Sequence, residues 1–142
     1  MEIVIDNSSL KRSISGSITG TIYLQIDNIQ FPAYKWNDFV VVLLNWWIEA
    51  LQSVEYKSEK NKSLPFRFMD GPYSFVLHSS IDNHSTVVLY EDNTILREYI
   101  INIKTFSESL KKASTEILNS LNELKWNNRD VELLKHNISK VE

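Results

Sequence analysis

The histidines are the first side chains of this sequence that could carry out chemistry. His78 and His84 flank a predicted hairpin turn, where the two rings could approach each other and form, with Asp82, a metal or acid–base site. No two of the three histidines have the spacing of a zinc protease or a zinc finger, and His136 falls on a predicted short surface helix. We interpret His78 and His84 as partly exposed hairpin residues. An enzyme built on His78, Asp82 and His84 stays a third hypothesis.

Carboxylates gather near the ends of predicted strands, where a cleft could form. They are Asp70, Glu91, Asp92 and Glu98. Two carboxylates held at a working distance can perform glycosidase-type acid–base chemistry. A small strand meander, however, places many acidic residues at strand ends by default. We therefore interpret the four as solvated or partner-facing groups.

The other residue types exclude several kinds of catalytic site. The chain has no cysteine, which excludes disulfides, zinc–thiolate sites, iron–sulfur clusters and a cysteine nucleophile. Gly16, Gly20 and Gly71 form neither a G-x-G-x-x-G nor a Walker phosphate loop. The serine-rich stretch 13–17 contains no nucleophile elbow. The sequence therefore predicts a protein that is not an enzyme and that holds no metal or cofactor.

Size and charge narrow the choice of partner. The chain has 142 residues, of which 43 % are hydrophobic, enough for one domain, 1–142, with one core. A net charge of −3 and a pI near 5.6 argue against nucleic-acid binding and suit a basic protein partner. The basic cluster 57–62 is interrupted by Glu59, which is typical of a solvated loop.

We expect no membrane partner. The densest apolar run, 39–48, contains Asn45 and is shorter than the about 20 residues of a membrane span. The N-terminal residues lack the basic start and apolar stretch of a signal peptide. These features predict a cytoplasmic protein.

The first half of the chain must supply two strands and a helix. Alternation predicts strands at 2–6 and 20–27, separated by a polar loop at 7–17. Apolar spacings of three and four residues predict a helix from about 38 to 54, with Asn37 or Asp38 at its start. The β-branched run 40–42 also permits a strand, but the pattern continues beyond ordinary strand length.

The second half predicts a meander followed by two helices. Strands at 64–70, 73–78, 86–91 and 95–104 are separated by turns at 70–72, 82–85 and 92–94. A capping box at Thr105 and Glu108 predicts a helix from about 106 to 126, and Asp130 is expected to cap a short terminal helix. The order β-β-α-β-β-β-β-α-α indicates an α+β fold, with two main helices on a single antiparallel sheet of about six strands.

Aromatic residues are expected in two places. Five of them lie on apolar stripes and are predicted to be in the core: Trp36, Trp47, Phe66, Phe68 and Phe75. Trp46 and Trp126 are less easily buried. Tyr73, after the Gly-Pro turn, and Tyr90, beside two carboxylates, are the candidates for exposed recognition aromatics.

Three segments between residues 20 and 104 share a style with a known class of bacterial proteins. They are FPAYKWNDFVVVLLNWW with its W-x-D-F, LPFRFMDGPYSFVL with its D-G-P-Y turn, and an acidic β-turn that precedes the closing helix. With its Asn/Ser/Lys-rich loops, acidic charge and lack of cysteine, the chain resembles the small immunity proteins of polymorphic-toxin and contact-dependent growth inhibition systems.

The resemblance implies a non-enzymatic cytoplasmic protein that binds and blocks one toxin domain. Such toxins are often basic nucleases, so the partner-binding residues it points to are Asp70, Glu91, Asp92 and Glu98, with Tyr73 and Tyr90 as anchors. The alternative is a small-ligand or regulatory domain with a pocket between the sheet and the helix near 36–54.

Overall fold

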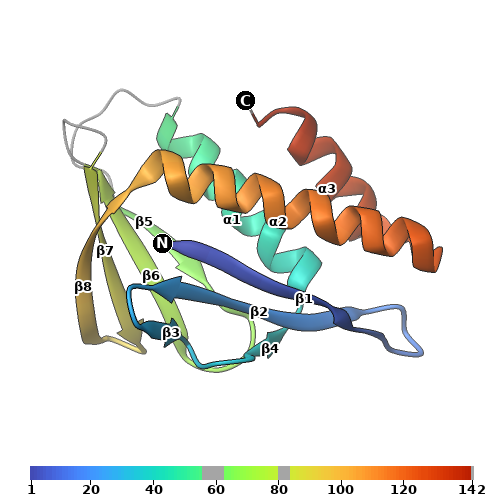
Figure 1. The fold of residues 1–142 in the computed structure, drawn as a ribbon, viewed down its shortest axis with the longest axis horizontal. Coiled ribbons are helices and arrows are strands. Elements are labelled where there is room, and N and C mark those ends of the chain that lie inside the picture. The colour runs from blue at the N-terminus through green and yellow to red at the C-terminus, as the bar shows by residue number, and fades with distance from the viewer. Residues whose placement is uncertain (56–62, 80–83, 142) are drawn as a thin grey trace.

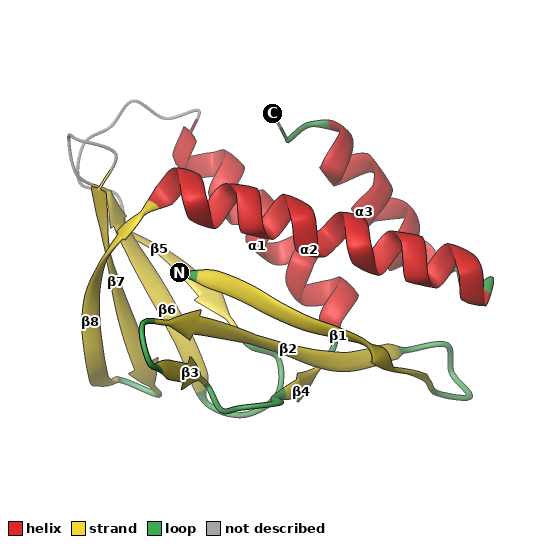
Figure 2. Cartoon of the chain, viewed as in Figure 1, coloured by secondary structure: helices red, strands yellow, loops and turns green. Residues whose placement is uncertain are grey.

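The computed structural model describes residues 1–55, 63–79 and 84–141. Within them the chain forms two four-stranded antiparallel sheets and three helices (Figure 1, Figure 2). The first sheet has the order β1-β2-β3, with β4 also paired to β2, and the second has the order β5-β6-β7-β8. The predicted α+β class is confirmed, and the single sheet of about six strands is wrong.

Each sheet is made of strands that are near one another in the sequence, and within the described residues no strand of one group pairs with a strand of the other. The first group precedes helix α1 and consists of β1 (Glu2–Arg12), β2 (Ile18–Ile26), β3 (Ile29–Phe31) and β4 (Asn37–Asp38). The second group follows it and consists of β5 (Ser63–Arg67), β6 (Tyr73–Ser79), β7 (His84–Glu91) and β8 (Thr94–Asn102). The helices are α1 (Val40–Glu55), α2 (Ile103–Leu124) and α3 (Arg129–Ser139).

Strand β1 is longer than the sequence predicts, because a polar stretch expected as a loop continues the strand through an irregularity. The register with β2 shifts between Asp6 and Lys11. Ser8 donates its backbone N–H to Asp6 Oδ1 at 2.9 Å, and Ser9 Oγ accepts the N–H of Thr21 at 2.8 Å. These short side chains replace missing ladder bonds, as at a β-bulge. The same polarity had indicated a loop.

Helix α1 agrees with the predicted helix at 38–54, and the strand alternative for its first residues is wrong. Its apolar residues face β2, β5, α2 and α3, so the helix is covered on several sides. Asn45 donates to the Asp130 carbonyl at 3.0 Å and accepts from Asn137 Nδ2 at 3.0 Å. This buried amide pair holds α3 against α1.

Asp38 joins the first sheet, α1 and the second sheet. Only 1 % of its surface is exposed. Its Oδ1 accepts the N–H of Phe39 at 2.7 Å, at the start of α1. Its Oδ2 accepts Trp36 Nε1–H and the backbone N–H of Asp70, both at 3.1 Å. The carboxylate predicted for the helix start thus bonds the residue that precedes α1, and it also holds the β5–β6 turn.

Both later helices begin at asparagines that the sequence analysis did not choose. Asn102 Oδ1 accepts the N–H of Lys104 at 2.9 Å, so α2 starts before the predicted capping box at Thr105. Asn128 Oδ1 accepts the N–H of Val131 at 2.9 Å, so Asp130 is not the cap of α3. A side-chain oxygen placed at the end of the preceding segment satisfies these free N–H groups first. The predicted stripe of α2 is buried as far as Leu121.

Aromatic side chains fill the space between α1, α2 and the second sheet. Trp47 lies with its ring centroid 5.2 Å from that of Phe68 and 5.4 Å from that of Phe75. Phe66 and Phe75 stack at 4.8 Å, and Phe106 of α2 lies edge-on to both. The rings therefore occupy the place where a pocket between helix and sheet was the alternative expectation.

The remaining tryptophans are less buried than these. Trp36, expected in the core, is half-buried and packs at its rim. Trp126 is also half-buried, with the guanidinium of Arg12 5.3 Å from its ring centroid, and Trp46 is exposed. No helix in the described part of the chain is long and apolar enough to cross a membrane.

Candidate functional site

The second sheet has one face in the core and one face turned away from it. Phe66, Phe75 and Leu89 point into the core. Their neighbours point the other way, so Val76 of β6, Val88 of β7 and Glu98 of β8 lie in one row across the outer face. The described helices lie on the core side of the sheet (Figure 1). Along this row Val88 is only 3 % exposed and Val76 is half-buried, so the exposed part of the outer face is its β8 side.

The outer part of β8 carries exposed apolar side chains. Ile95 is 56 % exposed, Leu96 43 % and Ile100 78 %. Ile95 lies opposite Tyr90 and Ile100 opposite Thr86, both on β7, whereas Leu96 is the extra residue at an irregularity of the ladder. β8 is also an edge strand of its sheet. We call Ile95, Leu96, Glu98 and Ile100 the β8 strip, and exposed apolar groups of this kind are typical of an interaction surface.

A groove of about 630 Å³ lies at one end of the same face. It runs between the β5–β6 turn and the β7–β8 turn, which the backbone bond from Asp92 N–H to the Pro72 carbonyl joins at 2.8 Å. Gly71 has a φ of 77°, and a side chain there would meet the Trp36 ring at 3.2 Å. The predicted turn residues Gly71 and Pro72 therefore form the wall of the groove on the side of the β5–β6 turn. Its lining includes Arg67, Tyr73, Ser74, Val76, Tyr90 and Asp92.

The structure brings five of the six predicted partner-binding residues to this end of the sheet. Tyr73 and Glu91 face each other in the register of β6 and β7, and the Tyr73 hydroxyl donates to Glu91 Oε1 at 3.4 Å. Tyr90 and Asp92 line the groove, and Asp70 is exposed on the turn that forms its wall. Glu98 lies apart from them, in the β8 strip.

The two predicted anchor tyrosines are half-buried, which corrects the expectation of exposed aromatics. The ring centroid of Tyr73 lies 5.4 Å from that of Trp36 and 5.8 Å from that of Phe31, edge-on in both cases. Packing against the first sheet covers one side of the ring, and its hydroxyl stays at the acidic end. Tyr73 thus acts as a rigid wall of the groove.

The charge of Glu91 is felt by the Tyr73 hydroxyl. Its negative charge, followed by partial burial and the hydrogen bond, raises the pKa of Tyr73 above the ordinary tyrosine value. We therefore expect the Glu91→Gln variant to lower the pKa of Tyr73, because the phenolate then meets no carboxylate. The measurement is the pH dependence of the Tyr73 ring carbon shift by NMR. Asp92→Asn is the control, and an equal change in both variants would contradict the pairing.

The sequence analysis missed the apolar part of this surface. Ile95-Leu96 and Ile100-Ile101 are consecutive apolar pairs, and in a regular strand such a pair places its side chains on opposite faces, as Ile100 and Ile101 do. Leu96, by contrast, is the extra residue of an irregularity and stays exposed together with Ile95. Ile101 is buried and Ile100 is exposed. Doubled apolar residues in an edge strand were the available signal. Arg67, the cation in the groove, gave no such signal.

The weak alternative of a histidine site falls partly outside the described residues and stays a prediction. His78 of β6 lies opposite Thr86 of β7, and His84 is two residues along β7 from Thr86, so the two histidines share a face of neighbouring strands. Asp82 and the basic cluster at 57–62 lie outside the described residues. In the parts of the chain that are described, no three His, Asp or Glu residues are grouped to hold a metal ion. His136 is exposed on α3, as predicted.

The chain was compared with family models, with curated proteins and with solved structures, and no match was found in any of the three. The similarity to immunity proteins therefore stays a prediction. The exposed β8 strip of the second sheet is the feature of the molecule that bears on it.

Proposed function

We propose that this chain is a non-enzymatic immunity protein of the cytoplasm, which binds a cognate bacterial toxin domain and neutralises it. The observation that carries the proposal is the outer face of the second sheet. It combines the exposed apolar residues of the β8 strip with Asp92, which lines the groove at one end, and Asp70 on the adjoining turn. Glu91 lies at the same end beside Tyr73, but on the other side of the sheet. No comparable reason supports a small-ligand pocket under α1, where aromatic rings fill the space.

The physical roles of the two parts differ. Apolar side chains that become dehydrated at the centre of an interface supply most of its affinity. Carboxylates at the rim steer a basic partner and increase the association rate. A basic nuclease domain, whose surface must attract phosphates, has the complementary charge.

Calorimetric titration with the C-terminal domain encoded immediately upstream tests the proposal directly. We expect one-to-one binding in the nanomolar range, about −12 kcal/mol. The toxin's activity is then assayed at equimolar protein and is expected to be abolished. A correctly folded upstream domain that does not bind would overturn the immunity function.

Substituting Ile100 tests where the toxin binds. Because Ile100 is 78 % exposed, Ile100→Asp should leave the fold intact and weaken binding by about a hundredfold through a charge placed in the apolar contact. Ile14→Asp is the matched control, since Ile14 is exposed in the β1–β2 turn. Equal affinities for the two variants would move the interface away from the β8 strip.

The acidic end is tested by its effect on rate. Combining Glu91→Lys with Asp92→Asn should slow association several-fold at low salt and reduce its salt dependence, with little change in dissociation. Asparagine is chosen at position 92 because Asp92 has a φ of 51°, which asparagine tolerates. Glu123→Lys on α2 is the control. Stopped-flow kinetics that are alike for both proteins would remove the steering role.

A further inference from the structure

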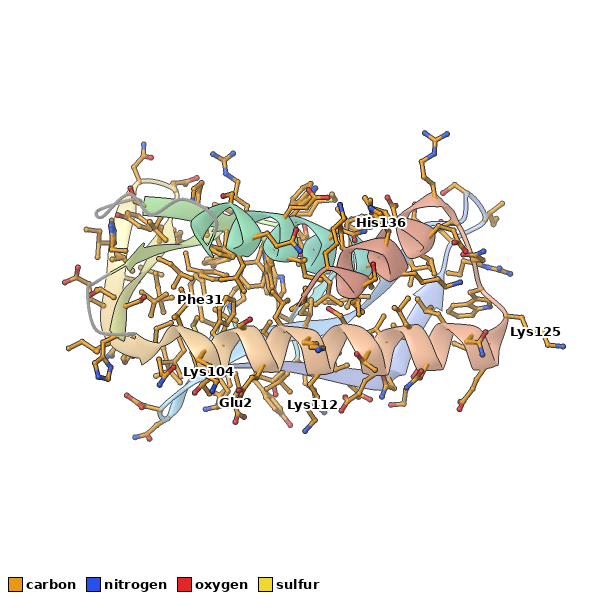
Figure 3. All side chains as sticks on the ribbon, turned by 90° about the horizontal axis from the view of Figure 1, so that it is seen from above. Glu2, Phe31, Lys104, Lys112, Lys125 and His136 are labelled. Carbon is orange, nitrogen blue, oxygen red and sulfur yellow. The ribbon has the colours of Figure 1, made fainter. Side chains whose placement is uncertain are left out.

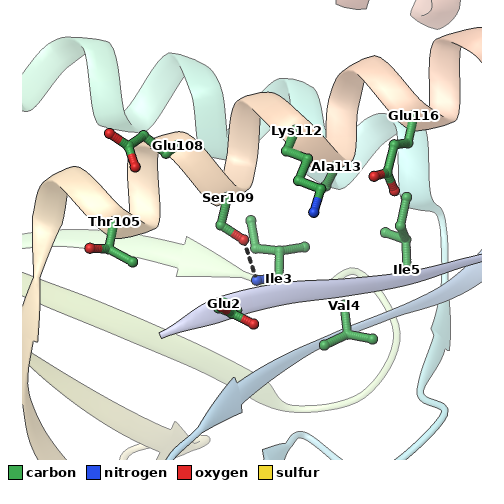
Figure 4. Close-up of a pocket in the computed structure, with 10 residues that line it drawn as sticks. All are labelled: Glu2, Ile3, Val4, Ile5, Thr105, Glu108, Ser109, Lys112, Ala113 and Glu116. Carbon is green, nitrogen blue, oxygen red and sulfur yellow. Dashed lines mark hydrogen bonds between the residues drawn. The ribbon is translucent and has the colours of Figure 1, made fainter.

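A second groove, of about 350 Å³, lies between the first sheet and α2. Its lining includes Ile3 and Ile5 of β1 and Ala113 of α2 (Figure 4). β1 is an edge strand of the first sheet, and α2 runs along it. Glu2 and Lys112 lie along the same side of α2 (Figure 3). The groove belongs to a different sheet from the surface proposed for the toxin.

The free edge of β1 faces this groove. The backbone N–H of Ile3 donates to Ser109 Oγ of α2 at 2.8 Å, so it points away from β2. In an antiparallel pair the direction of the N–H alternates along the strand, and Ile5 must point the same way as Ile3. Ile22, which lies opposite Ile5, donates its own N–H to the Trp36 carbonyl on the far side of β2 at 2.8 Å. Two independent bonds therefore place the N–H and C=O of Ile5 on the outer edge.

Ser109 satisfies one of these edge positions, and the next is left open. No hydrogen bond from the described residues reaches the outward N–H of Ile5. Ile5 is half-buried and lines the groove, so its backbone edge is accessible from it. An unpaired strand edge beside a helix is a site to which an extended peptide can add as a further strand.

The charges around the groove determine which peptide fits. Glu108, Lys112 and Glu116 are four residues apart on one face of α2, and Glu2 contributes a third carboxylate from β1. The lining thus has three carboxylates and one ammonium group, with apolar side chains beneath them. Figure 4 shows Ile3 and Ile5 pointing toward α2, and Glu2 and Val4 pointing away. Basic side chains of an added strand would meet a carboxylate on either side of it.

We infer that the groove between β1 and α2 binds an extended, lysine- or arginine-rich segment of a protein partner by strand addition at Ile5. The backbone of the segment pairs with the N–H and C=O of Ile5, and its basic side chains contact Glu108 and Glu116. The site goes beyond the toxin-binding face and does not depend on it.

The probe is the blocked peptide acetyl-Lys-Val-Arg-Val-Lys-amide, titrated into the ¹⁵N-labelled full chain. We expect amide shifts centred on Ile5 and on the α2 residues beside it, saturating below about 5 mM, a range typical of short peptides. Acetyl-Glu-Val-Glu-Val-Glu-amide should bind at least tenfold more weakly. A basic peptide methylated at its central backbone nitrogens should also lose binding, because it cannot donate to Ile5.

Three variants complete the test. The double variant Glu108→Gln, Glu116→Gln should weaken binding of the basic peptide about tenfold. Glu123→Gln, at the end of α2, should leave that binding unchanged. Ile100→Asp, which tests the toxin face, should leave peptide binding unchanged. Absence of shifts at Ile5, or shifts confined to the acidic end of the second sheet, would overturn the inference and leave the toxin proposal untouched. Equal binding of the methylated peptide would overturn strand addition.

Discussion

Trp47→Ala should lower the free energy of unfolding by about 3–5 kcal/mol, the usual cost of removing a large aromatic side chain from a core. Trp47 is fully buried and contacts Phe68 and Phe75 edge-on. Its Nε1–H also donates to the Arg67 carbonyl at 3.0 Å, which links α1 to the end of β5. Urea unfolding followed by circular dichroism measures the loss.

The neighbouring tryptophan provides the control for this measurement. Trp46 is 42 % exposed, so Trp46→Ala should cost below about 1 kcal/mol. Trp47→Phe separates the hydrogen bond from the packing and should cost less than the alanine change, because most of the ring is kept. Similar losses for Trp46→Ala and Trp47→Ala would contradict the placement of α1 against the second sheet.

Asp38→Ala is expected to cost about 2–4 kcal/mol, since it leaves several buried donors without an acceptor. The three donors are the backbone N–H of Phe39, the indole N–H of Trp36 and the backbone N–H of Asp70. The loss should be measured by urea unfolding. Hydrogen exchange should also show a faster Asp70 amide, because the β5–β6 turn loses its link to the first sheet.

Asp70→Ala is the matched control for Asp38→Ala. It removes an exposed carboxylate from the same turn but keeps the backbone N–H that bonds Asp38. We expect a change within about 0.5 kcal/mol, as for surface positions in general. Asp38→Asn should fall between the two, since its single oxygen can accept only part of the three bonds. An Asp38→Ala protein as stable as Asp70→Ala would show that the buried carboxylate does not hold the turn.

The two variants also bear on the proposed interface. Asp38 and Trp47 both fix the end of β5 and the turn that follows it, and this turn forms a wall of the acidic groove. A partially destabilising variant at either position should therefore weaken toxin binding by loosening the groove. Ile100→Asp acts on the same partner without that loss of stability, so the two kinds of effect can be separated.

Local sequence patterns were sufficient to predict those elements in which tertiary contacts favour the same secondary structure as the pattern. The apolar periodicity predicts a helix at 38–54, which is α1, and the alternation and turn residues of 64–104 predict the four-strand meander, although not that it forms a sheet of its own. The same turn chemistry placed Asp70, Tyr73 and Asp92 at one end of a meander. These features depend on residues close together in the chain, and sequence shows them directly.

Contacts between distant residues decided the rest. The number of sheets depends on which strands pair, and the polar residues 7–12 became strand only because Ser9 could bond Thr21. The start of α2 depended on Asn102 standing at the end of β8. Each outcome depends on which of the alternative hydrogen-bond partners a group takes, and the sequence pattern is compatible with either choice.

The functional surfaces divide in the same way. Composition alone determined the absence of cysteine chemistry and the acidic charge, and turn residues determined the acidic end of the second sheet. Only the tertiary structure decided that Ile100 is exposed while Ile101 is buried, that Tyr73 packs on Trp36, and that the edge of β1 opens beneath α2. The physical reason is that exposure belongs to the packing of whole elements, since one face of a strand becomes core only when another element covers it.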